Sequence, residues 1–180
     1  VEEIEHVELL KLYSTLEKID IASKNRKVVR VFDSHIEAPN WLATRNEFIY
    51  NSEGRLYSIP VSGGEPTLID TGFAVKCNND HGISPDGKFL YASNRGEANT
   101  ISIFKIIKNG QLQPLSVVSS LGKGPRNFVI DPTGKFLLVA HQYSNDIVVF
   151  KRDLSSGAIS DTGKRIELCS PVCLVFGNQK

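Results

Sequence analysis

The chain has 180 residues, of which 41% are hydrophobic, and its 21 basic and 20 acidic residues leave a net charge of +1. This length supports one sizeable hydrophobic core, so we expect a soluble globular protein. The near-neutral, evenly spread charge argues against a nucleic-acid partner, and no apolar run approaches the length of a membrane span. The sequence shows no signal peptide, and its compartment stays open.

The N-terminal part, residues 1–35, predicts an incomplete unit of β-structure. Helical spacing of its first apolar residues leaves a short helix as an alternative, but we favour a strand over residues 7–13. Residues 16–21 match residues 56–61 of the following unit, and residues 28–31 then form an outer strand. This unit therefore lacks an innermost strand.

A repeated phrase gives the most specific evidence of architecture. Residues 84–91 read SPDGKFLY and residues 131–138 read DPTGKFLL, which corresponds to a period of about 47 residues. Runs rich in β-branched and aromatic residues follow each copy, at residues 101–105 and 147–151. Several short strands within a period of about 40–50 residues are typical of β-propeller blades.

We therefore predict an all-β fold in which the whole chain forms one propeller unit, with four blades of four antiparallel strands. Three complete blades span residues 36–77, 78–122 and 123–168. The first blade combines residues 1–35 with a C-terminal strand inside residues 169–177, paired within one chain or between two chains. Such pairing removes the exposed edges that an open array of sheets would present.

Different parts of the chain resemble two families. Residues 124–138 (GPRNFVIDPTGKFLL) and 170–173 (SPVC) resemble the seven-bladed lactonase propellers, whose members include a 6-phosphogluconolactonase and muconate-lactonizing enzymes. Residues 36–41 (IEAPNW) and 54–57 (GRLY) are similar to TolB-type propeller repeats. Because both patterns share the SPDG phrase, we predict an engineered or recombined chimera whose junction lies near residues 84–90.

The resemblance implies seven blades for a lactonase and six for a TolB-type domain, so four blades reproduce neither central pocket. Blades of such rings splay by about 50–60° each, which is nearer the ~45° of an eight-bladed ring than the ~90° of a four-bladed one. We therefore predict an eight-bladed ring formed by a homodimer. A closed four-bladed monomer is the alternative.

Polar residues in loops around the channel are the candidates for a site. In a propeller, the loops entering each innermost strand and those joining the second and third strands share one face. The residues expected there are Asn40, Asp80, His81, Asn94, Arg95, Arg126, Asn127, His141 and Gln142. His81, Arg95 and Arg126 are the catalytic candidates, able to polarise a lactone carbonyl and activate water. The lactonase resemblance implies that the two arginines bind an anionic substrate group.

Because the earlier blades of the lactonase family are absent, we predict a propeller scaffold without an inherited active site. In this interpretation the chain is not an enzyme, and at most it binds a small molecule weakly in the channel. A lactone hydrolase similar to 6-phosphogluconolactonase is the alternative. The sequence contains no metal-ligand spacing, phosphate loop or nucleophile elbow, so we expect no cofactor and no metal.

Local structural roles are expected for several other residues. The three cysteines lie in apolar, strand-like contexts, which predicts buried free thiols. Trp41 is predicted to pack in the core or between blades. Asp86 and Asp131 flank the turns of the repeated phrase, and we expect their carboxylates to accept hydrogen bonds from nearby backbone N–H groups.

Overall fold

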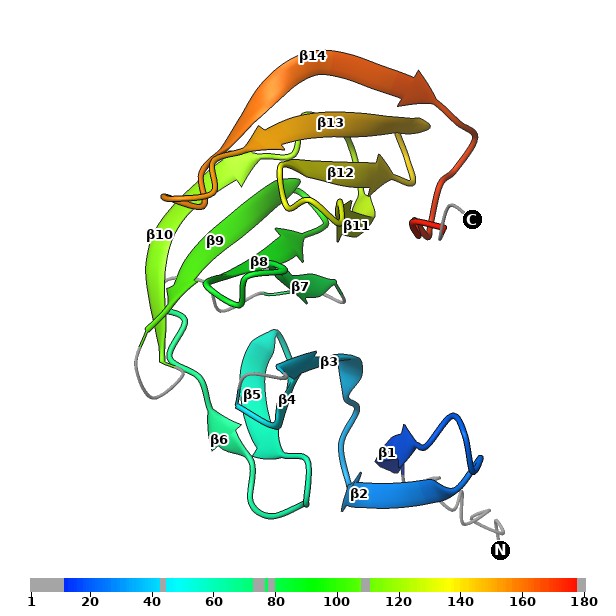
Figure 1. Cartoon of the computed structure of the whole chain (residues 1–180). Coiled ribbons are helices and arrows are strands. Elements are labelled where there is room, and N and C mark those ends of the chain that lie inside the picture. Colours follow the sequence, from blue (N-terminus) through cyan, green and yellow to red (C-terminus); the bar gives the residue numbers. More distant parts are fainter. Residues whose placement is uncertain (1–11, 43–44, 73–76, 78–79, 108–110, 178–180) are drawn as a thin grey trace, which may run out of the picture.

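A computed structural model describes residues 12–42, 45–72, 77, 80–107 and 111–177, in which the regular secondary structure consists only of β-strands. They form three antiparallel sheets of four strands and one of two, arranged along an arc (Figure 1). This confirms the prediction of an all-β fold. The strands are β1 (Ser14–Ile19), β2 (Arg26–Phe32), β3 (Glu37–Leu42), β4 (Glu47–Ser52), β5 (Arg55–Pro60), β6 (Thr67–Leu68), β7 (His81–Ile83), β8 (Phe89–Asn94), β9 (Thr100–Ile106), β10 (Leu112–Ser119), β11 (Pro125–Ile130), β12 (Phe136–His141), β13 (Asp146–Arg152) and β14 (Ile159–Glu167).

Each four-stranded sheet follows the chain from an inner to an outer strand, in the orders β3-β4-β5-β6, β7-β8-β9-β10 and β11-β12-β13-β14. Side chains alternate between the two faces of a strand, so a sheet at the end of the arc packs through one face and a sheet within it through both. In β13, for example, Val148 and Phe150 are buried, whereas Lys151 between Phe150 and Arg152 is exposed. The sheets thus stack face to face as propeller blades do.

The repeated phrase closes the tight turns between β7 and β8 and between β11 and β12. In the first turn, the Ser84 hydroxyl accepts a hydrogen bond from the Phe89 backbone N–H at 3.0 Å. In the second, Asp131 Oδ1 accepts one from the Phe136 N–H at 2.7 Å. Ser84 and Asp131 lie at equivalent positions, and the side chain of each accepts a hydrogen bond from the backbone N–H five residues later.

The carboxylates of these two turns accept hydrogen bonds from nearby backbone N–H groups, as expected from the sequence. Asp86 Oδ1 accepts a hydrogen bond from the Lys88 N–H at 3.3 Å, and Asp131 Oδ2 accepts one from the Thr133 N–H at 3.0 Å. The turn glycine Gly134 has a φ of +72°, a left-handed conformation that favours glycine. These contacts confirm the structural roles predicted for both aspartates.

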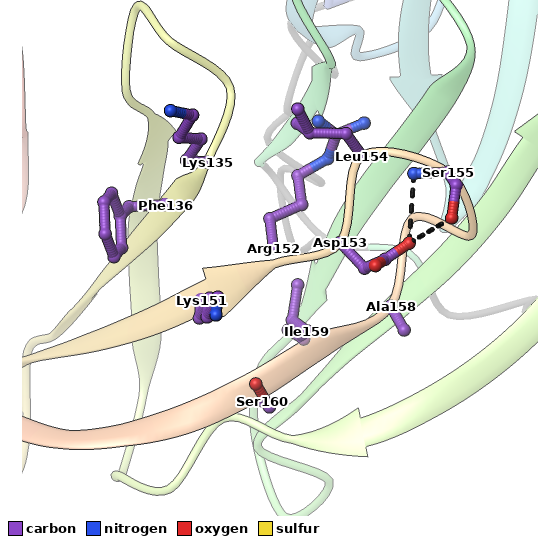
Figure 2. A pocket seen from close by; sticks show the side chains of 10 residues that line it. All are labelled: Lys135, Phe136, Lys151, Arg152, Asp153, Leu154, Ser155, Ala158, Ile159 and Ser160. Atoms are coloured by element: carbon purple, nitrogen blue, oxygen red, sulfur yellow. Dashed lines mark hydrogen bonds between the residues drawn. The ribbon is translucent and has the colours of Figure 1, made fainter.

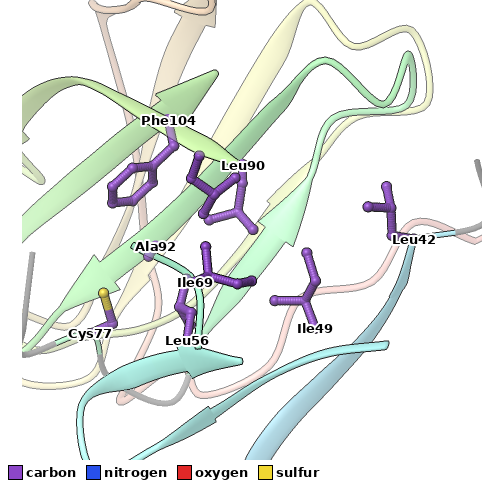
Figure 3. Packing of buried hydrophobic residues seen from close by; sticks show 9 residues of the cluster. Leu42, Ile49, Leu56, Ile69, Cys77, Leu90, Ala92 and Phe104 are labelled. Carbon is purple, nitrogen blue, oxygen red and sulfur yellow. The ribbon is translucent and has the colours of Figure 1, made fainter. Parts of the chain in front are cut away.

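Three apolar clusters fill the spaces between adjacent sheets. The cluster between β3–β6 and β7–β10 (Figure 3) consists of Leu42, Ile49, Leu56, Ile69, Cys77, Leu90, Ala92, Phe104 and Leu112. A second cluster joins β7–β10 to β11–β14, and a third joins β1–β2 to β3–β6. Burial of this apolar surface is the main force that holds the sheets together.

A buried arginine adds a polar network between the last two sheets. Arg152 Nε donates to the Tyr91 hydroxyl at 2.6 Å, and Nη1 donates to the Gly134 carbonyl at 2.9 Å. The Tyr91 hydroxyl in turn donates to the Gly157 carbonyl at 2.7 Å. The guanidinium carbon lies 5.3 Å from the centre of the Phe89 ring, close enough for a cation–π contact. The network therefore ties β8 to β13.

The fourth blade that the sequence predicts from residues 1–35 and 169–177, closed within one chain or between two, stays a prediction. Among the described residues, the first sheet contains only β1 and β2, and residues 171–177 form no strand. The two ends lie far apart in Figure 1. Residues 171–177 have no neighbouring strand among the described residues, so they cannot form the ladder of hydrogen bonds that defines a sheet. The strand predicted over residues 7–13 lies almost entirely outside the described residues.

Two predictions of burial are wrong. Trp41 lies on the innermost strand β3 and is 60% exposed. Its aromatic neighbour is Phe48, and the centres of the two rings are 6.0 Å apart. Cys77 is buried as expected, but Cys169 and Cys173 are exposed because the C-terminal segment lies at the open end of the arc. In the described part of the chain, no helix has the length and apolar character needed to cross a membrane.

Candidate functional site

Three innermost strands, β3, β7 and β11, lie side by side and line a cavity of about 440 Å³. Asn40 comes from the middle of β3, Asp80 and His81 from the entry to β7, and Asn127 from β11. The structure therefore brings four of the nine predicted channel residues to one hollow. We call it the inner-strand cavity.

Asp80 is the carboxylate of this cavity, and it is held from the next sheet. Its Oδ2 accepts a hydrogen bond from the Phe128 backbone N–H at 2.6 Å and one from the Asn127 side-chain amide at 3.0 Å. Burial raises the pKa of the Asp80 carboxyl to about 6, although these two bonds and the charge of Arg126 favour the ionised form. Such a carboxylate is ionised at neutral pH and still basic enough to accept a proton.

Backbone pairing places both predicted arginines at the same end of the sheets as Asp80. The end of β8 donates a backbone N–H to the Asp80 carbonyl at 2.9 Å, and Arg95 follows two residues later. In the next sheet, the Gln142 N–H donates to the Gly124 carbonyl at 2.9 Å, two residues before Arg126. Arg95 Nη2 donates to Gln142 Oε1 at 3.2 Å and so joins the two sheets.

His81 is held by contacts with the preceding sheet. Its ring is buried, and Nε2 lies 3.1 Å from the Ile49 carbonyl oxygen of β4. Burial lowers the pKa of His81 to about 4, so the ring is neutral at pH 7 and Nε2 carries the proton that the carbonyl accepts. The Asn40 amide also donates to the His81 carbonyl at 2.6 Å. Asp80 is therefore the better placed proton acceptor.

Asn94 and His141 do not line the inner-strand cavity. The Asn94 amide donates to the hydroxyls of Thr100 and Ser102, both at 2.9 Å, within its own sheet. His141 is fully buried, with Nδ1 3.4 Å from Asp146 Oδ1. Burial lowers the pKa of His141, and the neighbouring Asp146 carboxylate opposes this effect. Asn94 therefore has a structural role within its own sheet, and His141 is buried away from the cavity.

A second cavity, of about 620 Å³, lies at the opposite end of the last sheet (Figure 2). It is lined by Lys135, Phe136, Lys151, Arg152, Asp153, Leu154, Ser155, Ala158, Ile159 and Ser160. The Arg152 guanidinium is engaged by Tyr91 and Gly134, and Asp153 accepts hydrogen bonds from the Ser155 backbone and hydroxyl. Arg152 and Asp153 are thus held mainly by contacts within the fold, whereas the inner-strand cavity holds a carboxylate with a raised pKa and is the better candidate site.

In the described part of the chain, no group of three His, Cys, Asp or Glu side chains is arranged to hold a metal ion. The inner-strand cavity contains the perturbed Asp80 carboxylate and the amides of Asn40 and Asn127. Arg95, Arg126 and Gln142 are not among the residues that line it.

The hydrogen bond that links Asp80 to Asn127 across two sheets was not predicted from the sequence. Both residues were expected near the channel, but as separate ligand contacts. One signal was available, because Asp80 and Asn127 are separated by the same period as the repeated phrase. In a propeller, residues one period apart occupy equivalent positions in adjacent blades.

Comparison with known proteins identifies the relatives of this chain. The family described as "Lactonase, 7-bladed beta-propeller" matches residues 77–176. A 6-phosphogluconolactonase of Formosa agariphila is 57% identical over 79 residues, which are 43% of this chain and 22% of that protein. A solved structure assigned as a 6-phosphogluconolactonase of Bacteroides fragilis superposes with a TM-score of 0.73 and 31% identity, covering 90% of this chain and 51% of that one.

A solved structure assigned as TolB from Agrobacterium tumefaciens is also similar, with a TM-score of 0.58, 29% identity and coverage of 82% of this chain and 52% of that one. The likeness to the Bacteroides fragilis structure extends over both halves of the chain. The predicted chimera with a fusion near residues 84–90 stays a prediction.

The matches contradict two predictions, those of a scaffold without an inherited site and of a chain that is no enzyme. Relatives in sequence and in structure carry the name of a hydrolase. The segment that matches the family includes Asp80, Arg95 and Arg126, so the candidate residues for such an activity lie within it. The chain nevertheless spans about a fifth of the length of its Formosa agariphila relative.

Proposed function

The chain belongs to the seven-bladed β-propeller lactonase family, and on this premise we propose that it hydrolyses a lactone in the inner-strand cavity. The reaction opens a cyclic ester to a hydroxy acid. The single observation that carries the proposal is Asp80, a carboxylate whose pKa burial raises to about 6 at the entry to an innermost strand. A general base works best when its pKa lies near the operating pH.

In the proposed reaction, Asp80 removes a proton from a water molecule as the water oxygen attacks the lactone carbonyl carbon. The carbonyl π electrons move to the oxygen, and positive charge near the cavity stabilises the resulting oxyanion. The bond between the carbonyl carbon and the ring oxygen then breaks, and the ring oxygen takes the proton from Asp80. The product is a hydroxy acid, which loses a proton to solvent at neutral pH.

The arginines support an anionic substrate. Arg95 is fixed by its bond to Gln142, and Arg126 lies close enough to Asp80 to influence its pKa. Guanidinium groups bind carboxylate and phosphate through paired hydrogen bonds. We therefore propose a sugar lactone that bears a phosphate group, such as 6-phosphogluconolactone, in keeping with the names of the relatives.

In this proposal, residues 36–77, 78–122 and 123–168 each form one blade around the site. Residues 1–35 and 169–177 contribute to a further blade. Its support is the position of the three four-stranded sheets, which occupy residues 37–68, 81–119 and 125–167. Each of these blades supplies one innermost strand to the wall of the inner-strand cavity.

The test is hydrolysis of 6-phosphogluconolactone, followed by acid release and corrected for the spontaneous reaction. Asp80→Asn keeps the hydrogen-bonding shape but removes the base, so kcat should fall by at least about 100-fold. Asp33→Asn is the matched control, since Asp33 is an exposed aspartate outside the cavity. Equal activity of the two variants, or no enzymatic rate in the wild type, would contradict the proposal.

Substrate charge provides a second test of the same site. Arg126→Ala should raise KM for 6-phosphogluconolactone by roughly 10- to 100-fold, as expected for loss of a charged hydrogen bond. The change in KM for unphosphorylated gluconolactone should be several-fold smaller. A loss of equal size for both substrates would assign Arg126 to the carbonyl and exclude it from phosphate binding.

A further inference from the structure

Asn127 of β11 forms hydrogen bonds through both ends of its side-chain amide. Its Nδ2 donates to Asp80 Oδ2 at 3.0 Å, and its Oδ1 accepts a bond from the Leu174 backbone N–H at 2.6 Å. The amide therefore lies between the Asp80 carboxylate and the C-terminal segment, residues 171–176. Because a backbone N–H can only donate, the bond to Leu174 fixes which end of the amide is the oxygen. The NH₂ end then faces Asp80.

The C-terminal segment is anchored just before it begins. The Ser170 backbone N–H donates to Asn145 Oδ1 at 2.9 Å, and the Ser170 hydroxyl donates to the Gln142 carbonyl at 3.3 Å. Asn145 and Gln142 lie between β12 and β13, outside the inner-strand cavity. The Leu174 N–H thus reaches Asn127 from a segment that has its own attachment to the last sheet. This attachment makes Asn127 a fixed donor.

Asp80 receives its hydrogen bonds on one oxygen. The Phe128 N–H and the Asn127 amide both donate to Oδ2, at 2.6 Å and 3.0 Å. Two donors on one oxygen fix how the carboxylate is turned within the cavity that Asp80 lines. Because Oδ2 is occupied in this way, Oδ1 is the oxygen that can accept a proton from water.

Asn127 also acts on the ionisation of Asp80. Burial raises the pKa of the Asp80 carboxyl to about 6, and the bond from Asn127 and the charge of Arg126 act in the opposite direction. His81, the next residue, is neutral at pH 7 because burial lowers its pKa to about 4. From β3 the cavity receives the uncharged amide of Asn40. Asn127 therefore helps to keep the carboxylate ionised at neutral pH.

We propose that Asn127 is a positioning residue for the Asp80 base, which it orients and keeps ionised while the C-terminal segment holds its amide in place. An amide suits this role because it donates a hydrogen bond and does not titrate near neutral pH. The catalytic consequence rests on the proposed lactone hydrolysis. The effect of Asn127 on Asp80 is present without a substrate, so the two can be tested separately.

The test compares two variants, with the titration of Asp80 as the readout. Asn127→Leu removes both bonds of the amide. Asn127→Asp keeps an oxygen for the Leu174 N–H and replaces the donor to Asp80 by a second carboxylate. NMR of carbon-13-labelled aspartate measures the pKa of Asp80, and Asp80→Asn identifies its resonance. In Asn127→Leu this pKa should rise by about 1, as expected for the loss of one hydrogen bond to a charged group.

In Asn127→Asp the rise should be at least as large, because two carboxylates at hydrogen-bonding distance share one proton. A residue that only held the C-terminal segment would tolerate this change, since the bond to Leu174 is kept. Asn25→Asp is the matched control, because Asn25 is exposed between β1 and β2 and does not line the cavity. It should leave the pKa of Asp80 unchanged. Circular dichroism checks that each variant is folded.

Hydrolysis of 6-phosphogluconolactone, corrected for the spontaneous reaction, gives the catalytic readout. In Asn127→Leu, kcat/KM should fall about fivefold at about pH 6 and return towards the wild-type value at about pH 8, because the base is ionised at a higher pH. A fall by the same factor at every pH, or a pKa of Asp80 that is unchanged in both Asn127 variants, would overturn the proposal. A wild type without enzymatic activity would contradict the proposed function, and the titration alone would then decide whether Asn127 controls Asp80.

Discussion

Burial shifts the pKa values of two neighbouring residues in opposite directions. It raises the pKa of the Asp80 carboxyl to about 6 and lowers the pKa of the His81 ring to about 4. The common cause is that a buried site disfavours the charged form of either group. In unfolded chains the order is reversed, with Asp near 3.9 and His near 6.5. The two residues therefore make opposing contributions to stability in acid.

The signs follow from proton linkage. As pH falls from about 6.5 to 4, the unfolded chain protonates His81 before the folded one does, so this residue destabilises the fold. As pH falls from about 6 to 4, folded Asp80 takes up a proton that the unfolded chain does not, so this residue stabilises it. At neutral pH, the ionised Asp80 carries a cost that acid relieves.

We predict that variants at these positions separate the two effects. Relative to the wild type, the free energy of unfolding of His81→Asn should rise between pH 7 and 4.5, and that of Asp80→Asn should fall. Each change is on the order of 2–3 kcal/mol. Urea denaturation at several pH values measures them. Parallel pH curves for wild type and both variants would show that neither residue is buried as described.

At the scale of elements, β8 and β13 are joined by a cation that is buried between their sheets. Arg152 donates to the Tyr91 hydroxyl and to the Gly134 carbonyl. Arg152→Met should destabilise the fold by about 2–4 kcal/mol, because the Gly134 carbonyl is left unsatisfied in a buried place. The exposed Lys151 next to it provides the control, with Lys151→Met expected within about 0.5 kcal/mol of the wild type. Equal urea midpoints for the two variants would contradict the structural role of Arg152.

The sequence predicted best those strands whose turns carry their own chemistry. The phrases at residues 84–91 and 131–138 combine proline, glycine and a capping side chain, so their hairpins form from local contacts. The segment 171–176 has the composition of a strand but not the paired neighbour, and pairing is a tertiary property. Trp41 shows the same limit, since its 60% exposure depends on the surroundings of β3 and not on its own apolar character.

The candidate site was predictable in position but not in role. Loop placement on a propeller brought Asp80 and Asn127 to the channel. His81 was one of three catalytic candidates, with Arg95 and Arg126, on the basis of the usual chemistry of histidine. Its burial against the Ile49 carbonyl, which the structure shows, has no signature in the neighbouring sequence.

For the whole molecule, the open arc has exposed apolar surface at both ends. Ile19 and Val31 of the first sheet are 62% and 55% exposed, and the C-terminal segment is exposed at the other end.

The most direct test of the central claim is the pH dependence of kcat/KM for hydrolysis of 6-phosphogluconolactone by the wild type. If Asp80 is the general base, kcat/KM should rise with pH through an apparent pKa of about 6, because the carboxylate must be ionised to accept the proton of water. The same rise should be absent from the residual activity of Asp80→Asn. An unchanged profile in that variant, or a wild-type profile without a transition between about pH 5 and 7, would contradict the role of Asp80.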